Sequence, residues 1–401
     1  MASARVCILT VSLFGGMTLA MPASASDLDP TADAATDGDD RSDGSLGMTR
    51  DQDGAGIING ESATRDDYPQ TGGLLIDTTI TAGGFSADIQ TFVCSSTLIA
   101  PDVVLIAAHC IDPDALTYGY GDLIDTTHVW SRDADLSTYD GSRTGLPWPD
   151  DGVVVADTVM HPEWDLFSLG MGIDTNYDIG LLFLSEPVLD VEAALLPTAA
   201  EGALLEEGTE VAVVGWGQQV HVDGWGSPPA GTTMIKQQGI SHIAEIGAPE
   251  MQVGKEESDV RKCHGDSGGP SFAWVGQDTT QTMRLVGVTS HAYDASDCAE
   301  TGGVDTRVDF YLEWIDSEMR AACDAGTRVW CDEPGILPTD YYEPVVADDT
   351  GIDGKEGDED GDAADGSSAE GDKSGCMHAA GAMSGMGLML SLVAVARRRD
   401  D

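Results

Sequence analysis

Short apolar runs, separated by glycine, proline and aspartate, recur along the middle of this chain. They lie at 73–76, 92–107, 153–159, 179–184, 211–214 and 285–288. Many short strands at this spacing are typical of an all-β sandwich or barrel. One segment departs from the pattern: Val308, Leu312, Ile315 and Met319 recur at helical spacing. We therefore predict a helix over 308–319 that packs one face on the core.

The N-terminal end lacks this pattern. Arg5, a mostly apolar stretch and the small residues Ala23-Ser24-Ala25 together predict that residues 1–25 are a signal peptide. Residues 26–56 are rich in Asp, Ala, Ser and Gly and show no apolar periodicity, so we expect a flexible acidic propeptide there. Export would allow the cysteines of the mature chain to pair.

The C-terminal end also lacks the pattern of short apolar runs. Residues 345–375 are acidic and rich in Gly and Ser, which predicts a linker. Cys376 then precedes a weakly apolar run and the cluster Arg397-Arg398-Arg399. A run of about twenty such residues can just span a bilayer, and arginines after it suit a cytoplasmic end. We therefore expect residues 376–401 to be a membrane or sorting tail.

The net charge of the chain limits the classes of molecule that it can bind. Of 401 residues, 70 are acidic and 19 are basic, which gives a formal net charge of −51. This balance argues against nucleic acid as a partner, because phosphate binding needs a basic surface. A solvated acidic surface and an adaptation to salty surroundings both account for the acidity, and the sequence does not decide between them.

Three motifs carry residue types that catalyse acyl transfer. The first, Ala107-Ala108-His109-Cys110, supplies a histidine. The second, Asn176 to Leu182, supplies Asp178, and the third, Lys262 to Pro270, supplies Ser267 among glycines. Such a serine suits a nucleophile on a tight turn, because glycines let the backbone approach a bound carbonyl and point N–H groups at it.

In this order, the three motifs resemble the chymotrypsin/trypsin family of serine proteases. The resemblance covers residues 57–320. It implies an all-β fold of two perpendicular six-stranded antiparallel β-barrels with a C-terminal α-helix, flanked here by disordered acidic tails. Val213 to Gly217 is similar to the strand that opens the family's second barrel. Asp305 to Ile315 is similar to its closing strand and helix.

The resemblance implies a role for each residue of these motifs. His109 would accept the proton of Ser267 and pass it to the leaving amine, and Asp178 would orient His109. The backbone N–H groups of Gly265 and Ser267 would form the oxyanion hole. No cofactor and no metal is implied. The rival interpretation is a catalytically silent binding or adhesion protein on the same fold, and the intact set of three residues argues against it.

The start of the resemblance suggests activation by cleavage. Ile57 to Gly60 is similar to the mature N-terminus of the family. A freed Ile57 ammonium would pair with Asp266 and shape the oxyanion hole. Gly56 precedes the bond, where the family usually has Arg or Lys, and the nearest upstream basic residue is Arg50. We therefore expect a different maturing protease, or further trimming after cleavage at Arg50.

Six cysteines lie between the two ends, and we expect three disulfides: Cys94–Cys110, Cys263–Cys298 and Cys323–Cys331. The first two pairs are implied by the resemblance. They would pin the histidine loop and brace the wall of the specificity pocket. The third pair is what remains, and we expect it to close a loop in a small extension at residues 321–344.

The specificity pocket departs from that of tryptic family members. By motif spacing, Arg261 stands on the pocket floor where they carry Asp, and Lys262 lies beside it. Ser290 matches the serine that supports the catalytic aspartate, His291 replaces a usual Trp, and Asp305 replaces a usual Tyr. Cleavage after Arg or Lys is therefore not expected. Two alternatives stay open: a cationic floor that accepts acidic side chains, or an Arg261–Asp305 pair that leaves a neutral pocket.

These features predict a secreted or surface-anchored serine endopeptidase, made as a zymogen, that acts on protein or peptide substrates. We expect a monomer that needs an activating protease and reaches the membrane through residues 376–401. This tail resembles the MYXO-CTERM sorting tail of myxobacterial surface proteins, in which the neighbourhood of the cysteine, here Cys376, is the processing and anchoring point. A surface structural protein dominated by its tails is a further alternative. The natural substrate, tail cleavage and calcium binding are left open.

Overall fold

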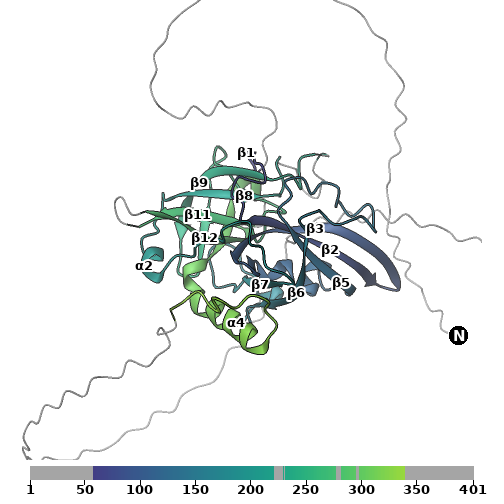
Figure 1. Ribbon diagram of the computed structural model, residues 1–401. Helices are drawn as coiled ribbons and strands as arrows, with labels where there is room; N and C mark the ends of the chain where they lie inside the picture. Colours follow the sequence, from purple (N-terminus) through teal and green to yellow (C-terminus); the bar gives the residue numbers. More distant parts are fainter. Residues whose placement is uncertain (1–56, 221–228, 230, 277–280, 295–297, 339–401) are drawn as a thin grey trace, which may run out of the picture. The chain divides into compact units, whose positions relative to one another are not determined.

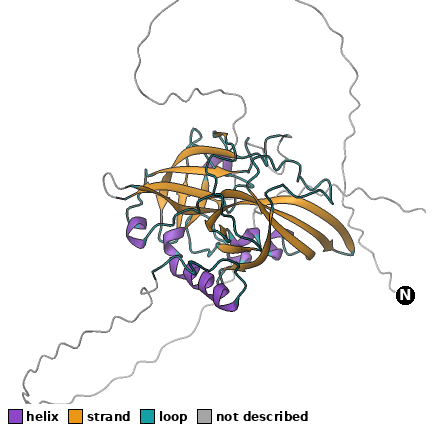
Figure 2. Ribbon diagram, in the orientation of Figure 1, coloured by secondary structure: helices purple, strands orange, loops and turns teal. Residues whose placement is uncertain are grey.

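Strands dominate the described part of the chain (Figure 1, Figure 2). The computed structural model describes residues 57–220, 229, 231–276, 281–294 and 298–338. The predicted signal peptide (1–25), propeptide (26–56), linker (345–375) and sorting tail (376–401) lie outside these residues. Within the described ranges, no helix is long and apolar enough to cross a membrane.

Six strands of the N-terminal half close into the first barrel. In ring order they are β2 (Thr71–Ala82), β3 (Phe85–Ala100), β4 (Val103–Ile106), β7 (Gly180–Leu184), β6 (Val153–Met160) and β5 (Asp122–Ser131). Every pair in the ring is antiparallel. The apolar runs before residue 200 all fall on these strands, as their period and length predict.

The C-terminal half forms the second barrel. Its ring consists of β8 (Glu210–Gly215), β9 (Gln237–Ile246), β10 (Glu250–Val253), β13 (Gly303–Arg307), β12 (Thr282–Ala292) and β11 (Pro270–Val275). Pairing of β8 with both β9 and β11 closes the ring, and the short β1 (Glu61–Ser62) adds to β9. The predicted fold of two six-stranded antiparallel barrels is confirmed.

Helices are short except at the C-terminal end. They are η1 (Ala108–Cys110), α1 (Pro113–Thr117), η2 (Leu166–Ser168), α2 (Ala199–Gly202), α3 (Cys298–Thr301), η4 (Val308–Phe310) and α4 (Leu312–Ala325). The predicted helix over 308–319 thus forms in two parts, η4 and α4, with Tyr311 between them. Gly326 ends α4 with a φ of 72°, a left-handed conformation that glycine adopts without a steric penalty.

One apolar cluster joins both barrels and α4. It contains Leu105 and Leu182 from the first barrel, Leu285 from the second, and Ile315 and Met319 from α4. All five side chains are buried. Burying one such side chain stabilises the fold by roughly 1.5–3 kcal/mol. The helical stripe seen in the sequence is therefore core packing that fixes how the two barrels meet.

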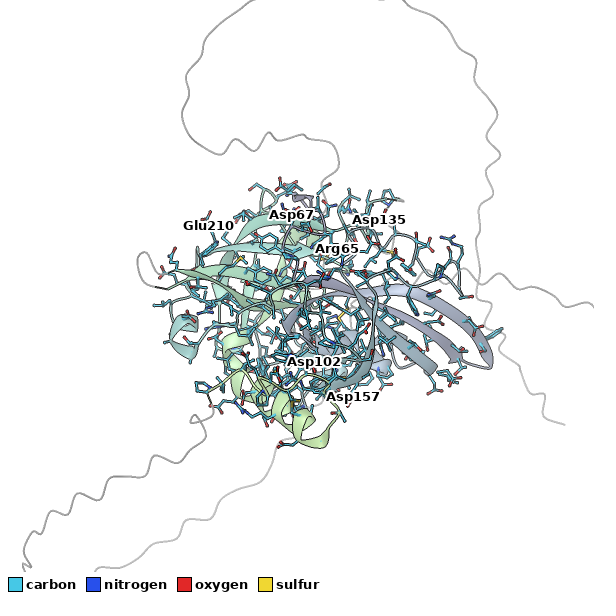
Figure 3. All side chains as sticks on the ribbon, viewed as in Figure 1. Arg65, Asp67, Asp102, Asp135, Asp157 and Glu210 are labelled. Carbon is cyan, nitrogen blue, oxygen red and sulfur yellow. A yellow bond between two sulfur atoms is a disulfide. The ribbon has the colours of Figure 1, made fainter. Side chains whose placement is uncertain are left out.

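A buried ion pair fastens the segment after α4 to the first barrel. Nη2 of Arg328 lies 2.7 Å from Oδ1 of Asp102, in the β3–β4 turn, and neither side chain is exposed. Figure 3 shows Asp102 beside α4. Its other oxygen accepts hydrogen bonds from the backbone N–H groups of the next two residues after Arg328. The Cys323–Cys331 disulfide closes this loop, so the described part of the extension predicted at 321–344 packs on the barrel.

Candidate active site

The first barrel brings His109 and Asp178 together through one strand pair. Strands β4 and β7 are antiparallel, and the last residue of β4, Ile106, lies opposite the first residue of β7, Gly180. The chain leaving β4 and the chain entering β7 therefore lie side by side. His109 follows β4 in η1, and Asp178 lies two residues before the start of β7. Two motifs about seventy residues apart thus meet at one end of the ladder.

Three donors fix the Asp178 carboxylate. Nδ1 of His109 lies 2.7 Å from Oδ2, and the backbone N–H of His109 donates to Oδ1 at 2.9 Å. The hydroxyl of Ser290 donates to Oδ2 at 2.6 Å. Burial favours the neutral acid, but the imidazole and these donors lower the pKa of Asp178 below its ordinary value. A charged carboxylate in this position holds the proton of His109 on Nδ1 and leaves Nε2 free to accept one.

Ser267 lies on a turn that requires glycine. Gly265 and Gly268 have φ angles of 93° and 75°. A Cβ on Gly265 would lie 2.9 Å from the Cα of Gly217, and one on Gly268 would lie 2.5 Å from the carbonyl oxygen of Ser95. Both the backbone conformation and the space therefore exclude other residues at these two positions. The motif forms the tight turn that its glycines predicted.

The carbonyl groups of this turn are hydrogen-bonded within the described part of the fold, whereas two of its N–H groups are not. The carbonyl of Ser267 accepts a hydrogen bond from the N–H of Ser95 at 2.9 Å, and that of Gly265 accepts from the Ser95 hydroxyl at 3.0 Å. Among the residues that the structure describes, the N–H groups of Gly265 and Ser267 have no hydrogen-bond partner. Two adjacent donors on one rigid turn are what stabilisation of an oxyanion requires.

Strand β12 places this turn beside the His109–Asp178 pair. Two backbone hydrogen bonds, of 2.7 and 2.9 Å, join Thr289 of β12 to the two glycines that follow Ser267. The next residue along β12 is Ser290, whose hydroxyl contacts Asp178. The structure therefore assembles the three motifs at one place between the barrels.

Asp266 is a fully buried carboxylate next to Ser267. Its oxygens accept hydrogen bonds from the N–H groups of Gly217 and Cys263, both at 2.9 Å. Burial nevertheless raises its pKa to about 7. The side chain of Ile57, the first described residue, is fully buried in the core of the second barrel. The fold thus buries Ile57 and holds a carboxylate that a cation would stabilise.

A second buried ion pair closes the base of the pocket. Nζ of Lys262 lies 2.6 Å from both oxygens of Asp305 and 2.8 Å from the hydroxyl of Ser271. Neither member of the ion pair is exposed. Burial lowers the pKa of Lys262, while the Asp305 charge acts in the opposite direction. Asp305 thus uses both oxygens on one ammonium group.

The position of Arg261 corrects the sequence-based interpretation of the pocket. Its backbone N–H donates to the carbonyl of Ile58 at 2.9 Å, and its Nη2 donates to the carbonyl of Glu257 at 3.0 Å. The Arg261–Asp305 pair, one of the two alternatives left open by the sequence, does not form, because Lys262 takes that place. Neighbouring residues of an extended segment point to opposite sides. The guanidinium therefore points away from the carboxylate that the adjacent ammonium reaches.

A small cavity of about 30 Å³ lies next to Ser267. Residues from before β11, from the end of β12 and from the start of β13 line it, among them Lys262, Ser290, His291, Gly303 and the Cys263–Cys298 disulfide. Arg261 is not one of the lining residues. Of the residues predicted for the pocket, the structure therefore brings Lys262, Ser290 and His291 to the cavity, with Asp305 behind Lys262.

His291 connects Ser290 to the loop before Asp178. Its Nε2 lies 3.0 Å from the carbonyl oxygen of Gly172, and its Nδ1 lies 3.0 Å from the Ser290 hydroxyl. Burial lowers the pKa of His291 below its ordinary value, while the Gly172 carbonyl and the charge of Asp178 act in the opposite direction. The N–H of Gly172 also donates to the carbonyl of Tyr293 at 2.8 Å. Residues at the end of β12 thus hold this loop from one side.

The cysteines of the site are disulfide-bonded. Among the described residues, two groups of side chains lie close enough to share a metal ion, but each consists of a histidine and two cysteines that are paired with each other. The histidines are His109 and His264. A paired cysteine offers no thiolate, so neither group has the ligands of a zinc site.

Three further residues of the site were not predicted. The Ser95 hydroxyl accepts from the N–H of Trp216 while donating to the turn, and the Thr306 hydroxyl donates to the carbonyl of Asp178 at 2.9 Å. Glu250, at the start of β10, bonds the loop before Asp178. The only sequence signal for it is a charged residue at the start of a short strand, which does not say what it contacts.

Comparisons with known proteins agree with this geometry. Residues 57–315 match the trypsin family. The chain is 28% identical over 271 residues to "Trypsin" from Saccharopolyspora erythraea, which covers 66% of this chain and 99% of that protein. It is 27% identical over 288 residues to phenoloxidase-activating factor 3 of Holotrichia diomphalia, and this match covers 67% of this chain and 74% of that protein.

A longer relative is matched only in part. The chain is 25% identical over 279 residues to the serine protease Hayan of Drosophila melanogaster, and the match covers 65% of this chain but only 38% of that protein. The similarity to these relatives is therefore one of the protease domain. With the family match over most of the chain and the barrels and turn described above, the chain belongs to the trypsin family.

Proposed function

We propose that this chain is a serine endopeptidase in which Ser267 is the nucleophile, His109 the general base and Asp178 the residue that orients it. Serine-type endopeptidase activity follows from its family, whose fold it shares. The observation that carries the residue assignment is the 2.7 Å contact between His109 and Asp178, next to the glycine turn of Ser267.

In this mechanism His109 Nε2 takes the proton of the Ser267 hydroxyl while Oγ attacks the substrate carbonyl carbon. The negative charge moves to the carbonyl oxygen, where the N–H groups of Gly265 and Ser267 stabilise it. His109 then gives its proton to the leaving amine, the C–N bond breaks, and an acyl-enzyme remains. Water, deprotonated by His109, releases the acid by the same steps in reverse order.

We further propose that cleavage of the Gly56–Ile57 bond activates the enzyme. The freed ammonium of Ile57 would pair with Asp266, whose buried carboxylate has a raised pKa and no ion-pair partner among the described residues. A basic residue does not precede the bond, so self-activation with tryptic specificity is not expected.

The proposed specificity follows from the ion pair below the cavity. Because Asp305 and Lys262 neutralise each other and Arg261 points elsewhere, the residues that the structure describes give the cavity no free charge. Its volume of about 30 Å³ suits a small side chain. We therefore propose cleavage after small uncharged residues.

We also propose export and attachment to the cell envelope, with the protein acting as a monomer on protein or peptide substrates. The features that support this are the signal-like segment at 1–25 and the cysteine, apolar run and arginines at 376–401. Both segments lie outside the described residues.

The nucleophile is tested by replacing Ser267 with alanine. A fluorophosphonate probe should label the wild-type protein, matured at Ile57, on Ser267, and Ser267→Ala should lose the label. Its kcat/KM should fall by about 10⁶-fold, because the mechanism has no second nucleophile. Ser62→Ala, an exposed serine on β1, is the matched control and should keep both label and rate. A folded, matured wild type that takes no label would favour the silent binding protein.

Activation is tested by Asp266→Asn. N-terminal sequencing of the active form should begin at Ile57. The asparagine leaves a buried ammonium unpaired, which costs about 3–5 kcal/mol, so kcat/KM should fall by about 10²–10⁴-fold. Asp157→Asn, at an exposed position on β6, should change nothing. Full activity with the propeptide attached would refute activation by cleavage.

Specificity is tested by profiling cleavage sites in a random peptide library. Wild type should prefer small uncharged residues before the scissile bond. Asp305→Asn frees the Lys262 ammonium and should shift the preference toward Asp and Glu by about 10–100-fold, the range of one charge-assisted contact. Arg261→Met should leave the preference as it is. Efficient cleavage after Arg or Lys by the wild type would overturn this description of the pocket.

A further inference from the structure

One buried carboxylate organises the loop that carries Asp178. Glu250 begins β10 and has 1% of its surface exposed. Its Oε2 accepts a hydrogen bond from the N–H of Asp174 at 2.9 Å, and Asn176 Nδ2 donates to both carboxylate oxygens, at 3.0 and 3.2 Å. The side-chain oxygen of Asn176 in turn accepts from the N–H of Gly170 at 2.7 Å. Glu250 therefore fixes residues 170–176, directly before Asp178.

The charge of Glu250 is not balanced by any cation that the structure describes. Within the described ranges, no basic side chain forms an ion pair with Glu250; Arg307, on the neighbouring β13, pairs with Asp309 instead. The groups that act on Glu250 electrostatically include Asp174 and Asp178 on the loop, and Tyr311 before α4 is also within its influence. A buried carboxylate beside two others is costly to keep charged.

The pKa of Glu250 reflects this balance. Burial is the largest influence and raises the pKa to about 7, and the charges of Asp178 and Asp174 act in the same direction. The hydrogen bonds from Asp174 and Asn176 oppose it. Glu250 therefore gains and loses its proton in the range where a serine protease works.

We propose that Glu250 is a positioning residue for Asp178, and that its ionised carboxylate orders the 170–176 loop and adds a negative charge behind the His109–Asp178 pair. This proposal rests on the catalytic roles given above to His109, Asp178 and Ser267. Glu250 contacts neither the reacting atoms nor Ser267, and it acts through the loop and its charge.

Protonation of Glu250 changes both contributions. An ionised carboxylate accepts on both oxygens, whereas the protonated acid turns one oxygen into a donor that faces the donors of Asp174 and Asn176. One hydrogen bond to the loop is lost. The negative charge near Asp178 also disappears, and with it a force that stabilises the imidazolium form of His109. The loop is still held by His291 through Gly172, so the change is local.

These effects predict the form of the acid limb of activity. Because Glu250 takes up its proton near pH 7, the acid limb of kcat/KM should include this proton in addition to the one taken up by the catalytic base. Above pH 7, Glu250 is charged, the loop is ordered and the rate is at its plateau. An ordinary single-base protease would show the uptake of one proton.

The test is Glu250→Gln in the full chain matured at Ile57. The glutamine amide has the same shape as the carboxyl group but does not titrate. Its NH₂ group faces the donors of Asp174 and Asn176 and cannot accept a hydrogen bond from them. The acid limb of kcat/KM should follow one ionisation, shifted to lower pH, and the plateau should fall about 10–100-fold. Glu250→Asp, which still ionises, should keep two ionisations. Glu210→Gln, an exposed carboxylate on β8 (Figure 3), is the control and should match wild type.

A second measurement does not depend on activity. In the Ser267→Ala chain, the NMR signals of the Asp174 N–H and of the Asn176 side-chain amide should change with a midpoint near pH 7, and Glu250→Gln should abolish this change. If wild type takes no fluorophosphonate label, the proposed function fails, yet this titration still tests the coupling of Glu250 to the loop. If Glu250→Gln keeps both the wild-type pH profile and the change of these signals near pH 7, Glu250 only packs, whatever the loss of rate.

Discussion

The hydrogen bonds of the Asp178 carboxylate are the interaction on which the rest of the site depends. The first barrel supplies two of its donors, the backbone and the ring of His109. The second barrel supplies the third, from Ser290. Because the donors come from both barrels, the carboxylate stays charged and buried only while the barrels are packed together. The apolar cluster shared with α4 provides that packing.

Much of the fold and the three motifs of the candidate site could be predicted because their signals are local. Short apolar runs give strands, and glycines around Ser267 give a turn whose φ angles exclude other residues. The chain order of three motifs then identifies the family, and the family supplies the meeting of His109 with Asp178. The geometry adds why they meet: paired residues Ile106 and Gly180 bring the two segments to the same end of a ladder.

The pocket and the loop contacts could not be predicted, because they depend on side-chain direction and on contacts between distant residues. Arg261 and Lys262 are neighbours in sequence, but only Lys262 faces Asp305, 43 residues later. Spacing alone does not tell which of two adjacent cations points inward. Glu250 likewise contacts Asn176, which lies 74 residues away, and the sequence around the two residues contains no signal for this contact.

The most direct test of this account is the kinetic effect of Asp178→Asn in the matured protein. The asparagine fills the same space, but it holds the wrong tautomer of His109, so Nε2 no longer accepts the serine proton. We expect kcat to fall by about 10⁴-fold at neutral pH while circular dichroism shows that the protein is folded. A folded Asp178→Asn protein that hydrolyses peptides at the wild-type rate would contradict the account.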